Sequence, residues 1–190
     1  VWGVSNGYEL DEGQRNGDFR PITKVSWYDA VKWCNAKSEH EAMEPVYRIE
    51  DSVFRKGDYG ASGSKWIKRN EKANGYRLPL EAEWEWAAIG GVMAIQPITK
   101  QAIIDKPNEP DDQPLAKETS SSYFNELGIY EITSNMWEWC WDQYDSSSAS
   151  RVYRGGGWSS DASFLRSARR ITTSPGGRRN NLGFRVSVSL

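Results

Sequence analysis

Apolar residues first fall into a regular pattern after residue 24, and that pattern predicts a helix. One helical face is apolar at the i, i+3, i+4 and i+7 positions, which hold Trp27, Ala30, Val31 and Cys34. Ser26 stands directly before this run and Asp29 follows three residues later, which resembles a capping box with Asp in the usual place of Glu. We therefore predict a helix over residues 27–38 with Ser26 as its N-cap.

A second apolar stripe predicts a shorter helix, and it consists of Leu80, Trp84, Ala87 and Ala88. Pro79 is expected at the first helical position, where the N–H that proline lacks would have no partner in any case. Three glutamates, at 81, 83 and 85, crowd the first turns, where the helix dipole favours acids. Gly90 and Gly91 are expected to end the helix.

The rest of the chain holds short and weak patterns. Residues 1–24 are expected to be irregular, and residues 45–75 to form a loop that can include a short hairpin. Residues 92–104 fit a strand or a short helix, and residues 106–122 fit a surface loop. Three strand-like pieces end the chain, at residues 151–157, 164–170 and 183–188. This mixture predicts an α+β fold, and 190 residues fit a single domain.

Composition excludes several functional classes. The net charge of −2 argues against a general affinity for nucleic acid or membrane surfaces. No apolar run approaches eighteen residues, so no transmembrane segment is expected, and no signal peptide is visible. Ten Trp suggest that large indole side chains hold the core together. Cys34 and Cys140, each beside a Trp, are interpreted as buried thiols rather than as a disulfide or a reactive site.

Charge is concentrated at the C-terminus. Residues 151–190 hold eight Arg, no Lys and one acid, Asp161. Such a tail could bind nucleic acid. However, the arginines are spaced through strand-like pieces, so we interpret several of them as multi-donor struts for carbonyl and carboxylate oxygens.

Six blocks of sequence, in this order, resemble the formylglycine-generating-enzyme or sulfatase-modifying-factor family. They are VSWYDAVKWCNAKSE (25–39), GYRLPLEAEWEWAAIGG (75–91), NELGIYEITSNMWEW (125–139), RVYRGGGW (151–158), RSARR (166–170) and NNLGFRV (180–186). The resemblance implies a C-type-lectin-like fold, with two helices, short twisted antiparallel sheets and much irregular structure.

The same resemblance argues against catalysis. The family's oxidase uses two cysteines near the C-terminus, and the matching positions here are Ser167 and a residue within 162–165, where no Cys stands. A hydroxyl has neither the acidity nor the metal softness of a thiol, so we expect no enzyme. His40 is interpreted as a surface residue. The alternatives are an oxidase with altered chemistry and an accessory structural domain.

Residues 157–181 resemble the variable proteins of diversity-generating retroelements, most closely the treponeme type. In those systems, changes at the adenines of Asn codons can produce residues such as Ser, Asp, Phe, Ile, Thr, Gly and Arg. Framework-like residues here, such as Arg166, Ala168, Pro175 and Arg178, alternate with slots of that kind. The predicted ligand-binding positions, including Trp158 as an apolar contact, are Gly157, Trp158, Ser159, Ser160, Asp161, Ser163, Phe164, Arg169, Ile171, Thr172, Thr173, Ser174, Gly177, Arg179 and Asn181.

This resemblance implies a non-catalytic, receptor- or adhesin-like protein whose residues 151–190 form a variable ligand-binding region. Its partner would be a protein or another macromolecule, and it would be located at the cell surface or secreted. No cofactor is required.

One cation site is implied by the family resemblance. The positions that match a family calcium site are Glu131, Ser134, Met136 and Glu138, and they would offer two carboxylates and two backbone carbonyls, which suit Ca²⁺. The alternative is that Glu138 pairs internally, for instance with an arginine of the C-terminal block.

Overall fold

The helix predicted after Ser26 is present in the computed structural model, which describes residues 2–14, 20–58, 66–91, 124–133, 135–160 and 166–188. Helix α2 covers Trp27–His40, two residues beyond the prediction. The capping box is confirmed, because the Asp29 N–H donates to Ser26 Oγ at 3.1 Å and the Ser26 N–H donates to Asp29 Oδ2 at 2.9 Å. A short helix, α1 (Trp2–Ser5), lies against α2 in a region expected to be irregular.

The second predicted helix is α3 (Glu81–Ala88), and its start differs from the prediction. Leu80 is the N-cap, so Pro79 precedes the helix instead of occupying its first position. The carbonyl of Pro79 accepts a hydrogen bond from the Trp141 N–H at 2.9 Å, which holds this residue against a strand. Gly90 and Gly91 end the helix as predicted, with φ angles of 87° and 65° that favour glycine.

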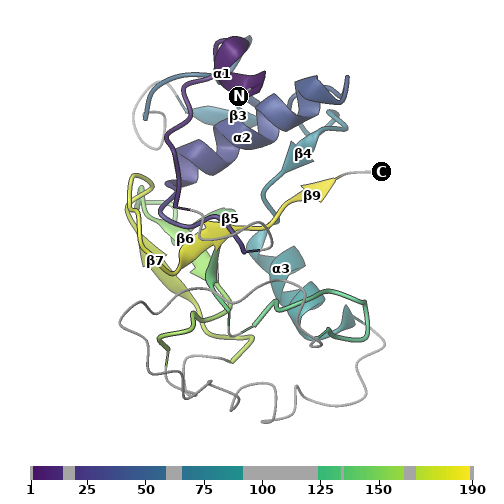
Figure 1. Ribbon diagram of the computed structural model, residues 1–190, viewed down its shortest axis with the longest axis vertical. Helices are drawn as coiled ribbons and strands as arrows, with labels where there is room; N and C mark the ends of the chain where they lie inside the picture. The colour runs from purple at the N-terminus through teal and green to yellow at the C-terminus, as the bar shows by residue number, and fades with distance from the viewer. Residues whose placement is uncertain are drawn as a thin grey trace.

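The strands of the described residues form three small sheets (Figure 1). The first has the order β2-β1-β3, with β1 at Tyr47–Ile49, β2 at Ser52–Val53 and β3 at Ile67–Arg69. The second pairs β4 (Tyr76–Arg77) with β9 (Ser187–Val188) near the C-terminus. The third has the order β7-β6-β5-β8, with β5 at Trp137–Gln143, β6 at Arg151–Arg154, β7 at Ile171–Thr173 and β8 at Leu182–Phe184.

Two sequence predictions about strands are wrong. Residues 45–75 contain a three-stranded sheet instead of a loop with a single hairpin. The strand predicted at 164–170 is not formed by its described part, residues 166–170, which include a turn closed by the Arg169 N–H on the Arg166 carbonyl. The strand instead follows at Ile171–Thr173, three β-branched residues. The predictions for residues 92–104 and 106–122 lie outside the described residues.

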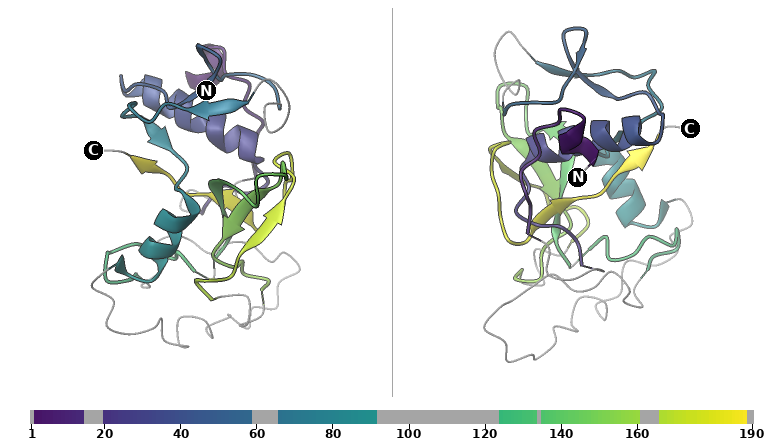
Figure 2. Two further views of the ribbon diagram at one scale, coloured as in Figure 1. Left: turned by 180° about the vertical axis from the view of Figure 1, so that it is seen from behind. Right: turned by 45° about the horizontal axis from the view of Figure 1, so that its top comes forward.

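The predicted α+β, C-type-lectin-like fold is confirmed, with one qualification about its sheets. Among the described strands, every pair is antiparallel except β5 with β8, which is parallel. Figure 2 shows this four-stranded sheet below α2. No helix in the described parts of the chain has the length and apolar character needed to span a membrane.

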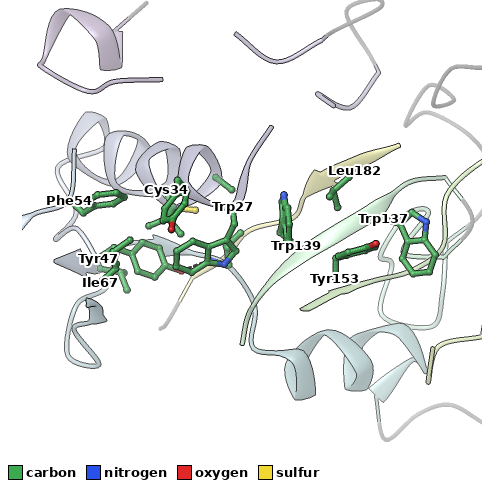
Figure 3. Close-up of a cluster of buried hydrophobic side chains, with 14 of the residues drawn as sticks. Trp27, Cys34, Tyr47, Phe54, Ile67, Trp137, Trp139, Tyr153 and Leu182 are labelled. Carbon is green, nitrogen blue, oxygen red and sulfur yellow. Dashed lines mark hydrogen bonds between the residues drawn. The ribbon is translucent and has the colours of Figure 1, made fainter. Parts of the chain in front are cut away.

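Tryptophans hold the core together, as their number suggested (Figure 3). Trp27, Trp137 and Trp139 belong to one buried cluster with tyrosines from β1 and β6. Their indole N–H groups find carbonyl partners when deeply buried: Trp27 Nε1 donates to Cys140 and Trp139 Nε1 donates to Val25, each at 3.0 Å. These bonds remove the cost of burying a donor. They also hold the start of α2 on β5.

Candidate functional site

The predicted ligand-binding slots lie on two segments that converge. The loop 157–160 leaves β6, and Asn181 stands just before β8. The two segments touch where Asn181 Nδ2 donates to Ser159 Oγ at 3.0 Å. The Trp158 N–H donates to the Asn135 carbonyl at 2.9 Å, and the Trp137 N–H donates to the Asn181 carbonyl at 2.8 Å. Both ends of the tract of residues 157–181 are therefore fastened near the start of β5.

Most described slots reach solvent. Ser159, Arg169, Ser174 and Arg179 are exposed, whereas Trp158, Ser160, Ile171, Thr172, Thr173, Gly177 and Asn181 are half-buried. Gly157 differs, because it is buried and a Cβ atom there would stand 3.1 Å from atoms of Trp137 and Asn181. Asp161, Ser163 and Phe164 lie outside the described residues. Eleven of the twelve described slots can therefore present side-chain or backbone atoms to a ligand.

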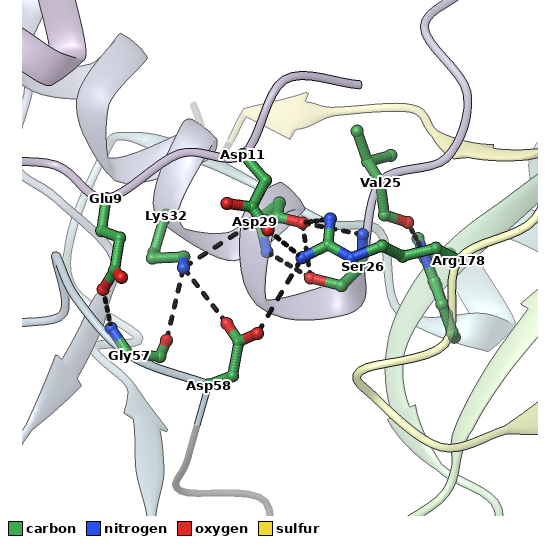
Figure 4. Close-up of polar contacts among 10 residues, drawn as sticks. Glu9, Asp11, Val25, Ser26, Asp29, Lys32, Gly57, Asp58 and Arg178 are labelled. Carbon is green, nitrogen blue, oxygen red and sulfur yellow. Dashed lines mark hydrogen bonds and ion pairs between the residues drawn. The ribbon is translucent and has the colours of Figure 1, made fainter. Parts of the chain in front are cut away.

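Residues between the slots are fastened to the scaffold. Arg178 pairs with the carboxylates of Asp29 on α2 and Asp11 in the N-terminal segment (Figure 4). Pro175 is buried, and its carbonyl accepts the Trp27 N–H at 2.9 Å. Arg166 and Ala168, which were expected to be framework, are exposed instead.

Three further arginines confirm the strut interpretation. Arg154 and Arg170 both donate to Glu81 of α3 at 2.7 Å, and Arg154 also donates to the Ser167 carbonyl at 2.8 Å. Arg151 donates to the Trp141 carbonyl at 2.7 Å and lies 4.0 Å from the Trp27 ring centroid. These contacts hold β6 and the turn after residue 166 against α3 and β5.

The thiols of this chain are far from the surface. Cys34 and Cys140 are unpaired and fully buried, the first in the main core and the second in a smaller cluster under α3. Burial raises the pKa of both thiols above the ordinary value, so neither forms a thiolate readily. Ser167 stands in the RSARR block and is half-buried. His40 lies edge-on against Trp2, with ring centroids 5.2 Å apart.

The two carboxylates among the positions that match a calcium site, Glu131 and Glu138, already accept hydrogen bonds from protein groups. Glu138 Oε2 accepts hydrogen bonds from Trp84 Nε1 at 2.7 Å and Arg185 Nε at 3.0 Å, and Oε1 accepts one from Arg185 Nη2 at 2.8 Å. Three of the roughly four lone-pair directions of this carboxylate are thus used. The Glu131 carboxylate accepts a hydrogen bond from Asn135. Ser134 lies outside the described residues, and calcium binding through Met136 and its neighbours stays a prediction.

Calcium is expected to have little effect on stability if Arg185 keeps its place on Glu138. A Ca²⁺ ion bound there would have to displace a guanidinium from a carboxylate that is only 4% exposed. Thermal unfolding with 1 mM CaCl₂ and with excess chelator should therefore give the same Tm, whereas a rise of several degrees with calcium would establish the cation site instead.

Two carboxylates with central roles could not be identified by sequence reasoning. Glu81 looked like one of three acids favoured by the helix dipole, and nothing local marks it as the partner of two arginines more than seventy residues away. Asp58, which contacts Lys32 at 3.2 Å, lies in a loop with no pattern. The even spread of arginines through the tail was the only signal for such pairs.

Sequence comparison identifies a matching protein family and several relatives of this chain. The family described as "Sulfatase-modifying factor enzyme 1-like domain" matches residues 4–190. The chain is 34% identical to "Chaperone protein LppX" of Paenibacillus barcinonensis, over 75% of the chain and 60% of the relative. It is 32% identical to "Inactive C-alpha-formylglycine-generating enzyme 2" of Bos taurus, over 60% of the chain and 44% of the relative.

Solved structures agree with this assignment. The structure of CarF matches with a TM-score of 0.80 and 26% identity, over 97% of this chain and 78% of CarF. Treponema denticola variable protein 1 matches with a TM-score of 0.71 and 28% identity, over 95% of this chain and 74% of that protein. The chain spans less than two thirds of the length of the two curated relatives named above. With a family match over nearly its whole length, the chain belongs to the sulfatase-modifying factor enzyme 1-like domain family.

Proposed function

We propose that this chain is a non-catalytic ligand-binding domain, receptor- or adhesin-like, whose C-terminal tract is diversified by a retroelement. Its ligand is a protein or another macromolecule, and its place is the cell surface or the extracellular medium. The similarity to Treponema denticola variable protein 1 supports this function over the others known for the fold.

The observation that carries the proposal is the separation of slots from framework within one tract. Eleven of twelve described slots are at least partly exposed. The residues that join the tract to the scaffold, among them Pro175, Arg178 and Leu182, are buried or ion-paired. Substitutions at the slots can therefore change the surface while the supporting contacts persist.

The physical properties of the surface suit recognition. A scaffold that holds its contact residues in place loses little conformational entropy on binding. Ile171 and Trp158 can contribute apolar contact area, and Arg169 and Arg179 can contribute charged contacts. Hydroxyl groups at Ser159, Thr172 and other slots add hydrogen-bonding capacity.

The cysteines of this chain and Ser167 argue against the oxidase reaction of the family. The family's oxidase uses two reactive cysteines, and the two cysteines here are buried in separate hydrophobic clusters. Ser167 cannot replace a thiolate. On this view the domain needs no cofactor.

The proposal is tested by sequencing the locus in several strains. We expect substitutions at slots such as Thr172, Ser174 and Arg179, while Pro175 and Arg178 stay constant. A near-identical repeat of the tract should lie nearby, beside a reverse transcriptase gene. Exposed residues outside the tract, such as Lys68, serve as the control for ordinary variation. Slots that are no more variable than Lys68 would contradict diversification.

A second measurement tests the absence of catalysis. The purified protein is incubated with a cysteine-containing sulfatase peptide and oxygen, and aldehyde formation is followed by mass spectrometry. We expect no turnover. Formation of the aldehyde would support the oxidase alternative.

A further inference from the structure

A cavity of about 500 Å³ lies on the side of the molecule formed by the N-terminal segment, the first turns of α2 and the residues from β8 onward. None of the residues that line it is a predicted slot. Its volume is within the range of small-molecule sites, roughly 300–1,000 Å³. Its apolar walls come from four separated segments and consist of Leu10, Ile22, Val25, Trp33, Phe184 and Val186.

Two aromatic rings form one wall of this cavity. Trp33 and Phe184 meet edge to face, with ring centroids 5.5 Å apart. Trp33 is 39% exposed, although it stands on the same helix as the fully buried Trp27. Aromatic faces of this kind favour a flat apolar group in stacked or edge-to-face contact.

Most charged groups in the cavity walls are already neutralised by a protein partner. Asp29 pairs with Arg178 and Lys32, and Asp11 pairs with Arg178 (Figure 4). Arg185 pairs with Glu138 at 2.8 Å. These groups therefore offer a ligand little net charge.

Arg20 is different from the other charged residues of the wall. It is half-buried, and no carboxylate within the described part of the chain forms an ion pair with it. A guanidinium presents its donors in a planar fork that matches the two oxygens of a carboxylate. In an apolar cavity such a pair is stronger than in water.

We propose that this cavity binds a small carboxylic acid with a flat, aromatic body. The carboxylate pairs with Arg20, and the ring system packs against the wall that Trp33 and Phe184 form. Because no slot lines the cavity, the same ligand would be bound whatever the diversified surface recognises. A failure of this proposal would therefore leave the proposed function untouched, and the reverse also holds.

Isothermal titration of the full chain with indole-3-acetate, 2-naphthoate and phenylacetate tests the proposal. We expect saturable binding of at least one acid with one site per chain. Indole-3-acetamide, which has the same shape without the charge, should bind at least tenfold more weakly than indole-3-acetate. If none of the three acids binds, or if acid and amide bind equally, the proposal is wrong.

Variants locate the site. Arg20→Gln should weaken binding of the acid at least tenfold while leaving the weak binding of the amide unchanged, and Trp33→Ala should weaken both. Lys68→Gln and Trp86→Ala, which change an exposed cation and an exposed Trp elsewhere, are the matched controls and should bind normally. Circular dichroism checks that each variant is folded, and Trp33→Phe, which keeps an aromatic wall, should retain most of the affinity. Normal binding by Arg20→Gln would overturn the assignment.

Discussion

Replacing Glu81 by alanine is expected to lower the free energy of unfolding by about 3 kcal/mol. Glu81 Oε1 accepts hydrogen bonds from Arg154 Nη1 and Arg170 Nε, each at 2.7 Å. The Arg154 side chain is only 2% exposed, so the substitution leaves a buried cation with one carboxylate fewer. Glu85 remains 2.8 Å away, which keeps the expected loss at the low end of the range for breaking a buried pair.

Urea unfolding at neutral pH measures this loss. Glu126→Ala is the matched control, because Glu126 is exposed in a turn, and its substitution should change the free energy by less than about 0.5 kcal/mol. Arg170 is itself 39% exposed and can turn to water, so most of the loss should come from Arg154. An effect of Glu81→Ala no larger than that of the control would show that the two arginines do not depend on this carboxylate.

Removing the Asp29 carboxylate is expected to reduce the loss of unfolding free energy that the protein shows as the pH falls. Burial alone would raise the pKa of Asp29, but hydrogen bonds from Ser26 and the charges of Arg178 and Lys32 outweigh it and hold that pKa below its ordinary value. A carboxyl whose folded pKa is lowered contributes stability that is present above its unfolded pKa, near 4. This contribution is lost as the pH falls through the folded pKa.

Asp29→Asn should therefore be less stable than the parent at pH 7, by about 3 kcal/mol, because Arg178 and Lys32 lose a buried partner. The difference should shrink steadily below pH 4. Unfolding free energies measured between pH 7 and pH 2 test this, with Asp51→Asn, an exposed carboxylate at the β1–β2 turn, as control. A difference that is independent of pH would mean that the carboxylate charge is not what stabilises the fold.

Local patterns predicted the parts of the fold that depend on neighbouring residues. The capping box at Ser26 and Asp29 is such a case, because both partners lie within one helical turn. The same Asp29 carboxylate binds Arg178, 149 residues away, and no local rule indicates that contact. The strands of residues 47–69 were missed for a related reason, since pieces of two or three residues are too short to show alternation.

Residue types were enough to propose the positions of the candidate surface. The contacts that bury or expose each position could not be predicted from the sequence. The slots were proposed from the kinds of residue at 157–181, and all but one of those described reach solvent. Gly157 is the exception, because its burial depends on Trp137 and Asn181 lying against it. Sequence reasoning gave no indication of the cavity beside Trp33, because its lining residues come together only when four separated segments fold.

The registers of β6 and β8 on β5 have a thermodynamic consequence for the tract between them. Glu138 of β5 faces Arg154 on one neighbouring strand and Gly183 on the other. The segment between those two residues therefore starts and finishes beside one residue, as a closed loop on a fixed base. The entropy of closing such a loop rises by only about 0.6 kcal/mol when its length doubles. Between its further attachments at β7, Pro175 and Arg178, the tract can thus change in length as well as in composition at little entropic cost.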